Sequence, residues 1–383
     1  MAKTGLATRL YRGEAGLNII GKKKVWFAVA GTVLLIALIS FFARGFTAGI
    51  EFKGGVEYTI PASAGSMTTV SDKLGEQITK VDPEAKVGTA QQLGGGSPAY
   101  KIRTTPMETG QVDTVKAALA SELGISKDTI STDIVSGAWG QQVTEKALLS
   151  LVIFLVVVMV YLVIRFEWRM AVAALASLAF DLVTAAAVYS IVGFEVTPST
   201  VIGFLTILGF ALYDVVVVFD KVQENTRSIT GSSTTTYAEA ANLAVNQTLM
   251  RSINTGLVSL LPVGGLLFIG AGLLGAGTLK DLGLVLFIGM GTAVYSSIFF
   301  ATPVLVTLKG YEPRIATHTQ RVLARREALK SKGLSDTAPV QKAGEEPALA
   351  GTAAPRPGAR PQGKKSGSGS GKGGVRPSAP KRR

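Results

Sequence analysis

The sequence predicts an α-helical membrane protein with six transmembrane helices and a small α+β domain outside the membrane. The first observation is composition: the 383-residue chain is 47% hydrophobic and only 17% charged, a balance typical of integral membrane proteins rather than soluble enzymes. The second is pattern. Six apolar runs lie along the chain, and about a hundred residues of soluble-domain composition separate the first run from the second.

Each apolar run is about long enough to cross a hydrocarbon core roughly 30 Å thick. The runs are 25–42, 147–164, 170–194, 201–219, 253–277 and 282–308. Lys22, Lys23 and Lys24 precede the first run, as in a signal peptide. This run is too long for a signal-peptide core, however, and FFAR at its end is no small-residue cleavage site. We therefore predict a retained first helix at 25–42 and a five-helix bundle at 147–308.

The polar stretch 43–146 predicts a folded α+β domain. Helix 108–123 has Val112, Val115, Leu119 and Leu123 at helical spacing. The predicted β-α-β-β-α-β order matches the ferredoxin-like pattern. Its strands are expected at 56–60, 86–93, 99–105 and 129–135, and its other helix at 66–81. The acidic and basic residues of this domain have no catalytic spacing.

Lysine and arginine are concentrated at 1–24, in the RFEWR connection at 165–169 and after 309, whereas the loop 195–200 has none. The positive-inside rule therefore places both termini in the cytoplasm and the α+β domain outside. The segment 309–383 has 17 Lys and Arg against 5 Asp and Glu. Its Gly/Pro/Ser-rich composition predicts a disordered basic tail, which either keeps the chain soluble or binds anionic lipid or ribosomal RNA. It lacks the folded basic surface of a specific nucleic-acid-binding domain.

Several kinds of chemistry are excluded by composition. The chain has no cysteine, so it has no disulfide or thiolate metal site. Its one histidine, His318, follows the last apolar run. No GxxxxGK[ST] phosphate-binding loop is present, which argues against an ATPase. We expect no enzyme activity, metal or cofactor, and proton chemistry within the membrane falls to carboxylates.

Asp214 is the most informative residue, because it interrupts the apolar run 201–219. A charged side chain at bilayer depth costs roughly 2.5–3.5 kcal/mol on insertion scales and usually faces the bundle interior or an ion path. Asp181 is a second such acid, in the run 170–194. Each aspartate either forms local hydrogen bonds in the bundle or is reversibly protonated. Arg251 opens the fifth span, two residues before the apolar run 253–277, and either extends to the membrane surface or approaches Asp214 and favours its charged form.

Two further groups have simpler interpretations. Asp220, Glu224 and Asn225 follow the fourth run and are typical of a solvated helix end. Gly54 and Gly55 predict a turn entering a strand.

Three segments resemble the SecD/SecF family of export-accessory membrane proteins, which belongs among the RND-type transporters. The first is GIEFKGG at 49–55, which is similar to the family signature after the first span through Gly49, Glu51, Phe52, Gly54 and Gly55. The others are ILGFALYDVVVVFDKVQEN at 207–225 and NQTLMRS at 246–252, which begins with Asn246 and Gln247. The resemblance covers roughly residues 20–310, with the segments in the family's order.

The resemblance implies an RND-type half of six helices in a bacterial cell membrane, paired with SecD. It places Asp214 at the position of the proton-carrying aspartate and Arg251 at that of the arginine that assists it. Asp181 matches an acid that follows a histidine in many relatives, but Phe180 precedes it here. Lys221 and Gln223 replace common arginines. These departures weaken the assignment of Asp181 and leave that of Asp214 unchanged.

The resemblance further implies a subunit that uses the proton motive force to assist export of SecA-dependent preproteins through the SecYEG channel, with YajC as another partner. It leaves open whether the ion is H⁺ or Na⁺. A scaffold that stabilises the translocon is one alternative, with Asp214 serving helix packing. An RND-type exporter of small molecules or lipids is another, although the α+β domain is small for a ligand pocket.

Overall fold

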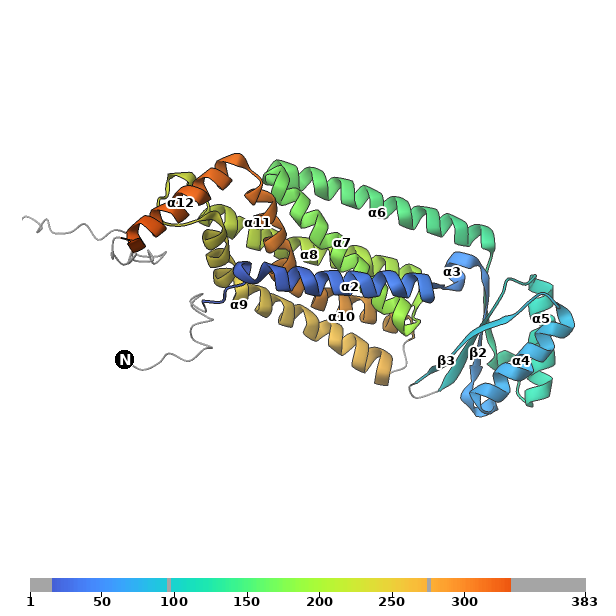
Figure 1. The fold of residues 1–383 in the computed structure, drawn as a ribbon. Helices are drawn as coiled ribbons and strands as arrows, with labels where there is room; N and C mark the ends of the chain where they lie inside the picture. Colours follow the sequence, from blue (N-terminus) through green and yellow to red (C-terminus); the bar gives the residue numbers. More distant parts are fainter. Residues whose placement is uncertain (1–15, 95–97, 274–276, 332–383) are drawn as a thin grey trace, which may run out of the picture. The chain divides into compact units, whose positions relative to one another are not determined.

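The structure is a computed structural model that describes residues 16–94, 98–273 and 277–331. Within these residues, six helices are long and apolar enough to cross a membrane, and a separate four-stranded domain is inserted between the first two (Figure 1). The predicted fold class is therefore confirmed. The six candidate spans are Ile20–Ala43, Gly137–Arg165, Trp168–Val192, Pro198–Gly231, Tyr237–Gly270 and Lys280–Gly310.

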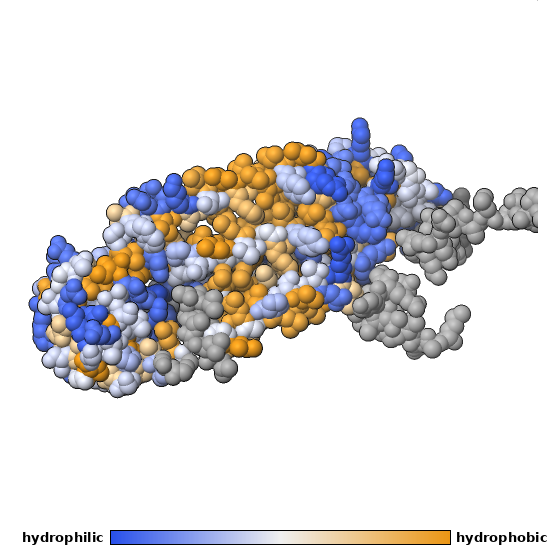
Figure 2. Space-filling model, turned by 180° about the vertical axis from the view of Figure 1, so that it is seen from behind, coloured by the Kyte–Doolittle hydropathy of each residue, from blue (hydrophilic) through white to orange (hydrophobic). Residues whose placement is uncertain are grey.

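The helical bundle has a buried centre and an apolar outer surface. Its helices are α2 (Lys23–Ala43), α6 (Gly137–Arg165), α7 (Trp168–Val192), α8 (Pro198–Asn225), α9 (Tyr237–Gly264) and α10 (Gly277–Ser296). Helices α7 and α8 bury much of their length, whereas α2 and α6 leave most of their apolar side chains exposed. Figure 2 shows the opposite face of the bundle from Figure 1, where a broad hydrophobic band lies between hydrophilic ends. Such a band is the surface that a bilayer, or a partner within it, would cover.

Two π-helical segments interrupt the bundle. These are η5 (Gly265–Leu273), which follows α9, and η6 (Ser297–Ala301), which joins α10 to α11 (Thr302–Gly310). Each lies beside a proline, Pro262 or Pro303. Proline has no backbone N–H to donate and crowds the carbonyl four residues earlier. At η6 the wider π turn accommodates that defect, since the carbonyl four residues before Pro303 is that of Phe299 in η6, and such turns are frequent at functional sites.

The α+β domain has the predicted split β-α-β order. Its strands β2 (Gly55–Pro61), β3 (Val87–Leu93), β4 (Ala99–Thr104) and β5 (Ser131–Val135) form an antiparallel sheet in the order β3-β4-β2-β5. The helices α4 (Met67–Val81) and α5 (Thr109–Leu123) bury Leu74, Ile78 and Leu119 against Val56 and Tyr58 of the central strand. Short 3₁₀ turns, η2 (Ala62–Ala64) and η3 (Lys127–Thr129), follow β2 and precede β5.

A small parallel ladder ties the chain after the first span to the turn between the third and fourth. Strand β1 (Thr47–Ala48) pairs with β6 (Glu195–Val196), and Thr47 is opposite Glu195. The one-turn helix α3 (Ile50–Lys53) follows β1 and packs against the start of α6. The turn between α7 and α8 is therefore hydrogen-bonded to the segment that leads into the α+β domain.

The region after the last span differs from the prediction. Residues Pro313–Ser331 form helix α12, although 309–383 was predicted to be a disordered tail. The helix is held by contacts that the composition does not reveal: His318 Nε2 lies 2.7 Å from the Ser232 carbonyl, next to the turn η4 (Ile229–Gly231), and Arg326 forms an ion pair with Glu239 (2.6 Å). The remainder of the predicted tail, 332–383, lies outside the described residues.

Candidate functional site

Asp214 lies in the middle of the bundle with both carboxylate oxygens hydrogen-bonded. It is 2% exposed on α8. The Ser252 hydroxyl of α9 donates to Oδ1 at 2.8 Å, and the Ser297 hydroxyl of η6 donates to Oδ2. The carboxylate is thus held by donors from two other helices. Hydrogen bonds of this kind stabilise a buried charge, and their loss is costly.

The π turn η6 places one of these donors. Ser297 is the first residue of η6, and its hydroxyl also lies 3.2 Å from the Val294 carbonyl. A π turn has more residues per turn than an α-helix, so it changes which side chains face a neighbouring helix. The side chain that meets Asp214 is therefore set by the irregular part of the sixth span.

Asp181 is buried without equivalent support. It is 0% exposed on α7, and neither carboxylate oxygen has a hydrogen-bond partner among the described residues. Serines lie around it: the Ser177 hydroxyl, one turn earlier, donates to Ser296 at 3.2 Å, and Ser296 is directed to the Ala293 carbonyl. The next residue, Ser297, donates to Asp214 instead. An unpaired buried carboxylate is costly when ionised.

The residue before Asp181 contributes only apolar packing. Phe180 stacks on Phe300 with ring centroids 4.8 Å apart. A phenylalanine at that position cannot pass a proton to Asp181.

The approach of Arg251 to Asp214, one of the two alternatives for this residue, is absent from this structure. Arg251 is exposed on α9 and forms no ion pair among the described residues. Successive residues of an α-helix point about 100° apart. Since Ser252 faces Asp214, its neighbour Arg251 must point elsewhere. The Ser252 hydroxyl occupies the contact position beside Asp214 Oδ1.

The remaining signature residues of α8 and α9 form contacts at the end of the bundle that lies opposite the α+β domain. Asp220 pairs with Arg165 (2.8 Å) on the surface, and exposed Glu224 pairs with Lys221 (2.8 Å). These contacts fit the solvated helix end that the sequence predicts.

Amides make the deeper contacts at this end. Asn225 donates to Gln247 at 2.9 Å, and Asn246 both accepts from the Leu17 N–H and donates to its carbonyl, each at 2.9 Å. None of these amides lies against Asp214. They join helices and hold the segment that precedes the first span.

The GIEFKGG signature forms the joint between the bundle and the α+β domain. The Gly49 N–H donates to the Val196 carbonyl at 2.9 Å, and Glu51 and Phe52 lie in α3. Gly54 has φ +77°, and a Cβ there would lie 2.7 Å from the backbone nitrogen of Gly137.

The second glycine of the pair is equally constrained. A Cβ on Gly55, the first residue of β2, would lie 2.5 Å from the Thr104 carbonyl oxygen. Only glycine fits these two backbone positions. The segment is the predicted turn into a strand, and the turn also packs directly against a transmembrane helix.

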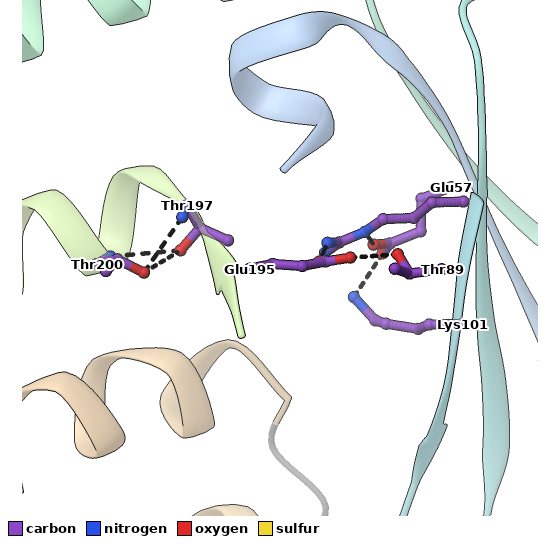
Figure 3. Close-up of polar contacts among 7 residues, drawn as sticks. Glu57, Thr89, Lys101, Glu195, Thr197 and Thr200 are labelled. Carbon is purple, nitrogen blue, oxygen red and sulfur yellow. Dashed lines mark hydrogen bonds and ion pairs between the residues drawn. The ribbon is translucent and has the colours of Figure 1, made fainter. Parts of the chain in front are cut away.

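A buried ion network lies at the same joint (Figure 3). Glu195 of β6 is 4% exposed; it forms an ion pair with Arg103 of β4 and accepts a hydrogen bond from Thr89 of β3. Arg103 also donates from Nε to Glu57 at 2.8 Å, and Lys101 pairs with the other oxygen of Glu57. The turn that links the two aspartate-bearing helices is therefore bonded to the sheet of the α+β domain.

The electrostatics of Glu57 follow from this arrangement. Burial by itself raises the pKa of the Glu57 carboxyl. The hydrogen bonds and positive charges of Lys101 and Arg103 outweigh burial and hold that pKa below its ordinary value of 4.5. Glu57 thus stays ionised as the shared anchor of two cations.

The sequence did not identify several residues of these two sites. Ser177, Ser296 and Ser297 occur in apolar runs, where Ser296 and Ser297 form a visible adjacent pair, and Ser252 directly precedes the fifth run. Glu195 and Arg103 gave no signal, because they are separate in sequence and only the fold joins them. Among the described residues, no cluster of His, Asp and Glu is placed to hold a metal ion.

Comparisons with known proteins point to one family. Residues 114–311 match the model described as "Protein export membrane protein SecD/SecF, C-terminal". The chain is 44% identical over 336 residues to "Protein translocase subunit SecF" of Streptomyces coelicolor, covering 88% of both chains. It is 42% identical over 382 residues to the protein of that name from Mycobacterium tuberculosis H37Rv, covering 92% of this chain and 85% of the other.

A solved structure shows the same fold. The crystal structure of SecDF from Thermus thermophilus, described as a translocon-associated membrane protein, superposes with a TM-score of 0.66 at 28% identity. The superposition covers 77% of this chain and 39% of the Thermus chain. This chain thus spans about two fifths of that longer protein.

Proposed function

Because this chain belongs to the SecD/SecF family of protein-export membrane proteins, we propose that it is an accessory subunit of a Sec protein translocase and that it uses the proton motive force to assist preprotein export. It is a multi-pass membrane protein. The single observation that supports proton coupling is Asp214, an acid buried among six membrane-spanning helices and held by hydroxyl donors from two of them.

In the proposed cycle, protonation of Asp214 weakens its hydrogen bonds to Ser252 and Ser297, because a neutral carboxyl is a poorer acceptor than a carboxylate. The three spans that meet there then repack. Asp181 exchanges protons with Asp214 through the intervening serines, and Arg251 approaches Asp214 only in another conformation. A proton moving inward across 100 mV releases about 2.3 kcal/mol, which is comparable to one charge-assisted hydrogen bond.

Movement reaches the α+β domain through the joint. Helices α7 and α8 carry the two aspartates, and the turn between them is bonded to the domain by β6, Glu195 and Arg103. A shift of these helices would tilt the domain, which holds or pulls a preprotein. The positive-inside rule places this domain outside the cell membrane and both termini in the cytoplasm.

The proposed partner is SecD, which would supply the second half of an RND-type unit. The Thermus relative has a SecDF chain more than twice the length matched here, consistent with two halves in one polypeptide. Exposed Arg251 within the bundle surface also needs a polar partner at membrane depth. SecYEG, YajC and SecA-dependent preproteins are the proposed further partners.

Proteoliposomes containing this chain, SecD and SecYEG would test the proposal. Asp214→Asn preserves shape and hydrogen-bonding capacity but cannot carry a proton. We expect it to abolish proton flux and the stimulation of preprotein release by an imposed gradient. The matched control is Asp220→Asn, six residues later on the same helix and on the surface. Unchanged stimulation in Asp214→Asn would instead support a scaffold in which Asp214 only packs helices.

A further inference from the structure

Two asparagines of α9 bind the backbone of the segment before the first span. We call this segment, from Leu17 to Ile20, the N-terminal strap. Asn246 accepts a hydrogen bond from the Leu17 N–H and donates one to the Leu17 carbonyl, each at 2.9 Å. Asn242 accepts from the N–H groups of Ile19 and Ile20 at 2.9 and 3.0 Å, and it also donates to the Leu17 carbonyl at 2.9 Å. Five hydrogen bonds therefore join the strap to one helix.

The strap is anchored in the bundle by burial as well. Ile19 and Ile20 are buried in the same apolar cluster as Ala241 and Val245 of α9. The side chain of Asn246 is buried too. A buried polar group that loses its partner keeps the full cost of its removal from water. The strap is therefore a fixed point against which α9 is held.

The two asparagines fix how α9 is rotated about its own axis. Successive residues of an α-helix are turned by about 100°, so Asn242 and Asn246 point in nearly the same direction. Ser252, which faces Asp214, points about 100° away from that direction. All three residues belong to the same α-helix, Tyr237–Gly264. The orientation that the asparagines set is therefore transmitted along the helix to Ser252.

The other contacts of this stretch of α9 determine its rotation less strongly. Among the described residues, Gln247 is the one further side chain between the asparagines and Ser252 that bonds to a neighbouring element, and it accepts a single bond from Asn225 at 2.9 Å. The buried apolar side chains beside the asparagines include Ala241 and Ala244. Alanine side chains are short and allow close approach without interlocking. Polar side chains at a helix interface, in contrast, specify how the helices are aligned.

The strap bonds exclude the orientation in which Arg251 faces Asp214. Arg251 and Ser252 are adjacent, so a turn of α9 by about 100° would exchange one for the other beside Asp214. Because the Cα atoms of a helix lie about 2.3 Å from its axis, that turn moves each Cα by about 3.5 Å. The bonds to the strap, at 2.9–3.0 Å, cannot all persist through such a displacement. Arg251 can therefore reach Asp214 by this rotation only after the strap is released.

We propose that Asn242 and Asn246 are positioning residues of the proton site. While they hold the strap, α9 presents Ser252 to Asp214; when the strap is released, α9 turns and presents Arg251. This inference rests on the proposed function, in which Asp214 carries the proton. It identifies the contact that selects between a hydroxyl and a guanidinium beside that carboxylate.

Double-mutant cycles in thermal unfolding of the full-length chain in nanodiscs would test the assignment. The strap-release variant carries Asn242→Ala and Asn246→Ala. In the wild type, Ser252→Ala should lower the unfolding midpoint by several degrees, because Asp214 loses a donor, and Arg251→Gln should leave it unchanged. In the strap-release variant the order should reverse. Asn242 lies about 15 Å from Ser252 along the helix axis, a separation at which purely structural effects on stability are additive.

Asn18→Ala is the matched control. Asn18 lies within the strap, but among the described residues its side chain bonds only the nearby Gly21 N–H, at 2.8 Å. Its removal therefore leaves the strap attached to α9. In this variant Ser252→Ala and Arg251→Gln should change the midpoint as they do in the wild type.

A milder variant serves if the strap-release variant does not fold. Asn242→Ala alone keeps both bonds of Asn246 to the strap, and it should shift the effects of Ser252→Ala and Arg251→Gln in the same direction by less. The proposal is overturned if these effects in the strap-release or milder variant equal those in the wild type, or if Asn18→Ala alters them as much. Unfolding is measured without a proton gradient, so abolished proton flux in Asp214→Asn would leave the proposed function intact even then.

Discussion

Arg103→Gln should loosen the attachment of the α+β domain to the turn between α7 and α8. The substitution removes a charge that is shared by Glu195 and Glu57. Afterwards Glu57 retains Lys101, but Glu195 retains, among the described residues, only the Thr89 hydroxyl. The reverse substitution, Glu195→Gln, is milder, because Arg103 still has Glu57 at 2.8 Å.

The magnitudes follow from burial. Arg103 and Glu195 side chains are 13% and 4% exposed, so solvent does little to screen the pair. Removing one partner of a buried pair costs about 3–5 kcal/mol, because the other charge is left uncompensated. We expect this for Arg103→Gln. Glu195→Gln should cost about 1–2 kcal/mol, in the range of a single lost hydrogen bond, and the double variant should cost less than the sum.

Hydrogen exchange of the full chain in nanodiscs would measure the effect. The informative amides are those of the β1–β6 ladder and of Gly49, whose N–H donates to Val196. A local loss of about 3 kcal/mol corresponds to exchange more than a hundredfold faster. Lys127→Gln is the control, since its ion pair with Asp113 is long (3.7 Å) and solvated and contributes at most about 1 kcal/mol.

The reasoning would be refuted if Arg103→Gln accelerated exchange in the ladder no more than Lys127→Gln does. Equal acceleration of exchange by Arg103→Gln and Glu195→Gln would show that the ion pair of Arg103 with Glu57 does not stabilise the arginine once Glu195 is neutral. That result would remove the physical basis for the predicted order.

Two further predictions concern the α+β domain and its joint. The pKa of Glu57 is lower in the folded protein than its ordinary value of 4.5, so its ion pairs stabilise the domain above that value, and this stabilisation is lost as pH falls through the folded pKa. Acid unfolding monitored by circular dichroism should show a smaller pH dependence in Glu57→Gln, and an identical pH dependence would contradict the assignment. Gly140→Ala should destabilise the joint by about 1–3 kcal/mol, because the new Cβ would lie 2.5 Å from the Phe52 carbonyl oxygen. Gly110→Ala, which meets nothing within 4 Å, is its control in thermal unfolding and should be neutral or slightly stabilising; equal losses in both would exclude a steric cause.

Much of the fold follows from local sequence properties. The length of each apolar run determined the six spans, and the spacing of Val112, Val115 and Leu119 determined a helix of the α+β domain. Asp214 was visible because a carboxylate in an apolar run is conspicuous whatever surrounds it. Segment 313–331 was not predicted as a helix, because its composition is polar and its order depends on contacts such as Arg326 with Glu239.

The groups that Asp214 meets depended on tertiary structure. Ser252 and Ser297 lie 38 and 83 residues from it along the chain. Whether Ser252 or the adjacent Arg251 faces Asp214 depends on the rotation of α9 about its axis. The position of Ser297 depends on the π turn of the sixth span. The sequence by itself determined which carboxylate is costly to bury, since that cost follows from the residue and its apolar neighbours. Only the packing of helices that are distant in the sequence decided which hydrogen-bond donors offset that burial cost. A hydrogen bond requires its donor and acceptor at defined positions in space, and no local sequence pattern specifies those positions.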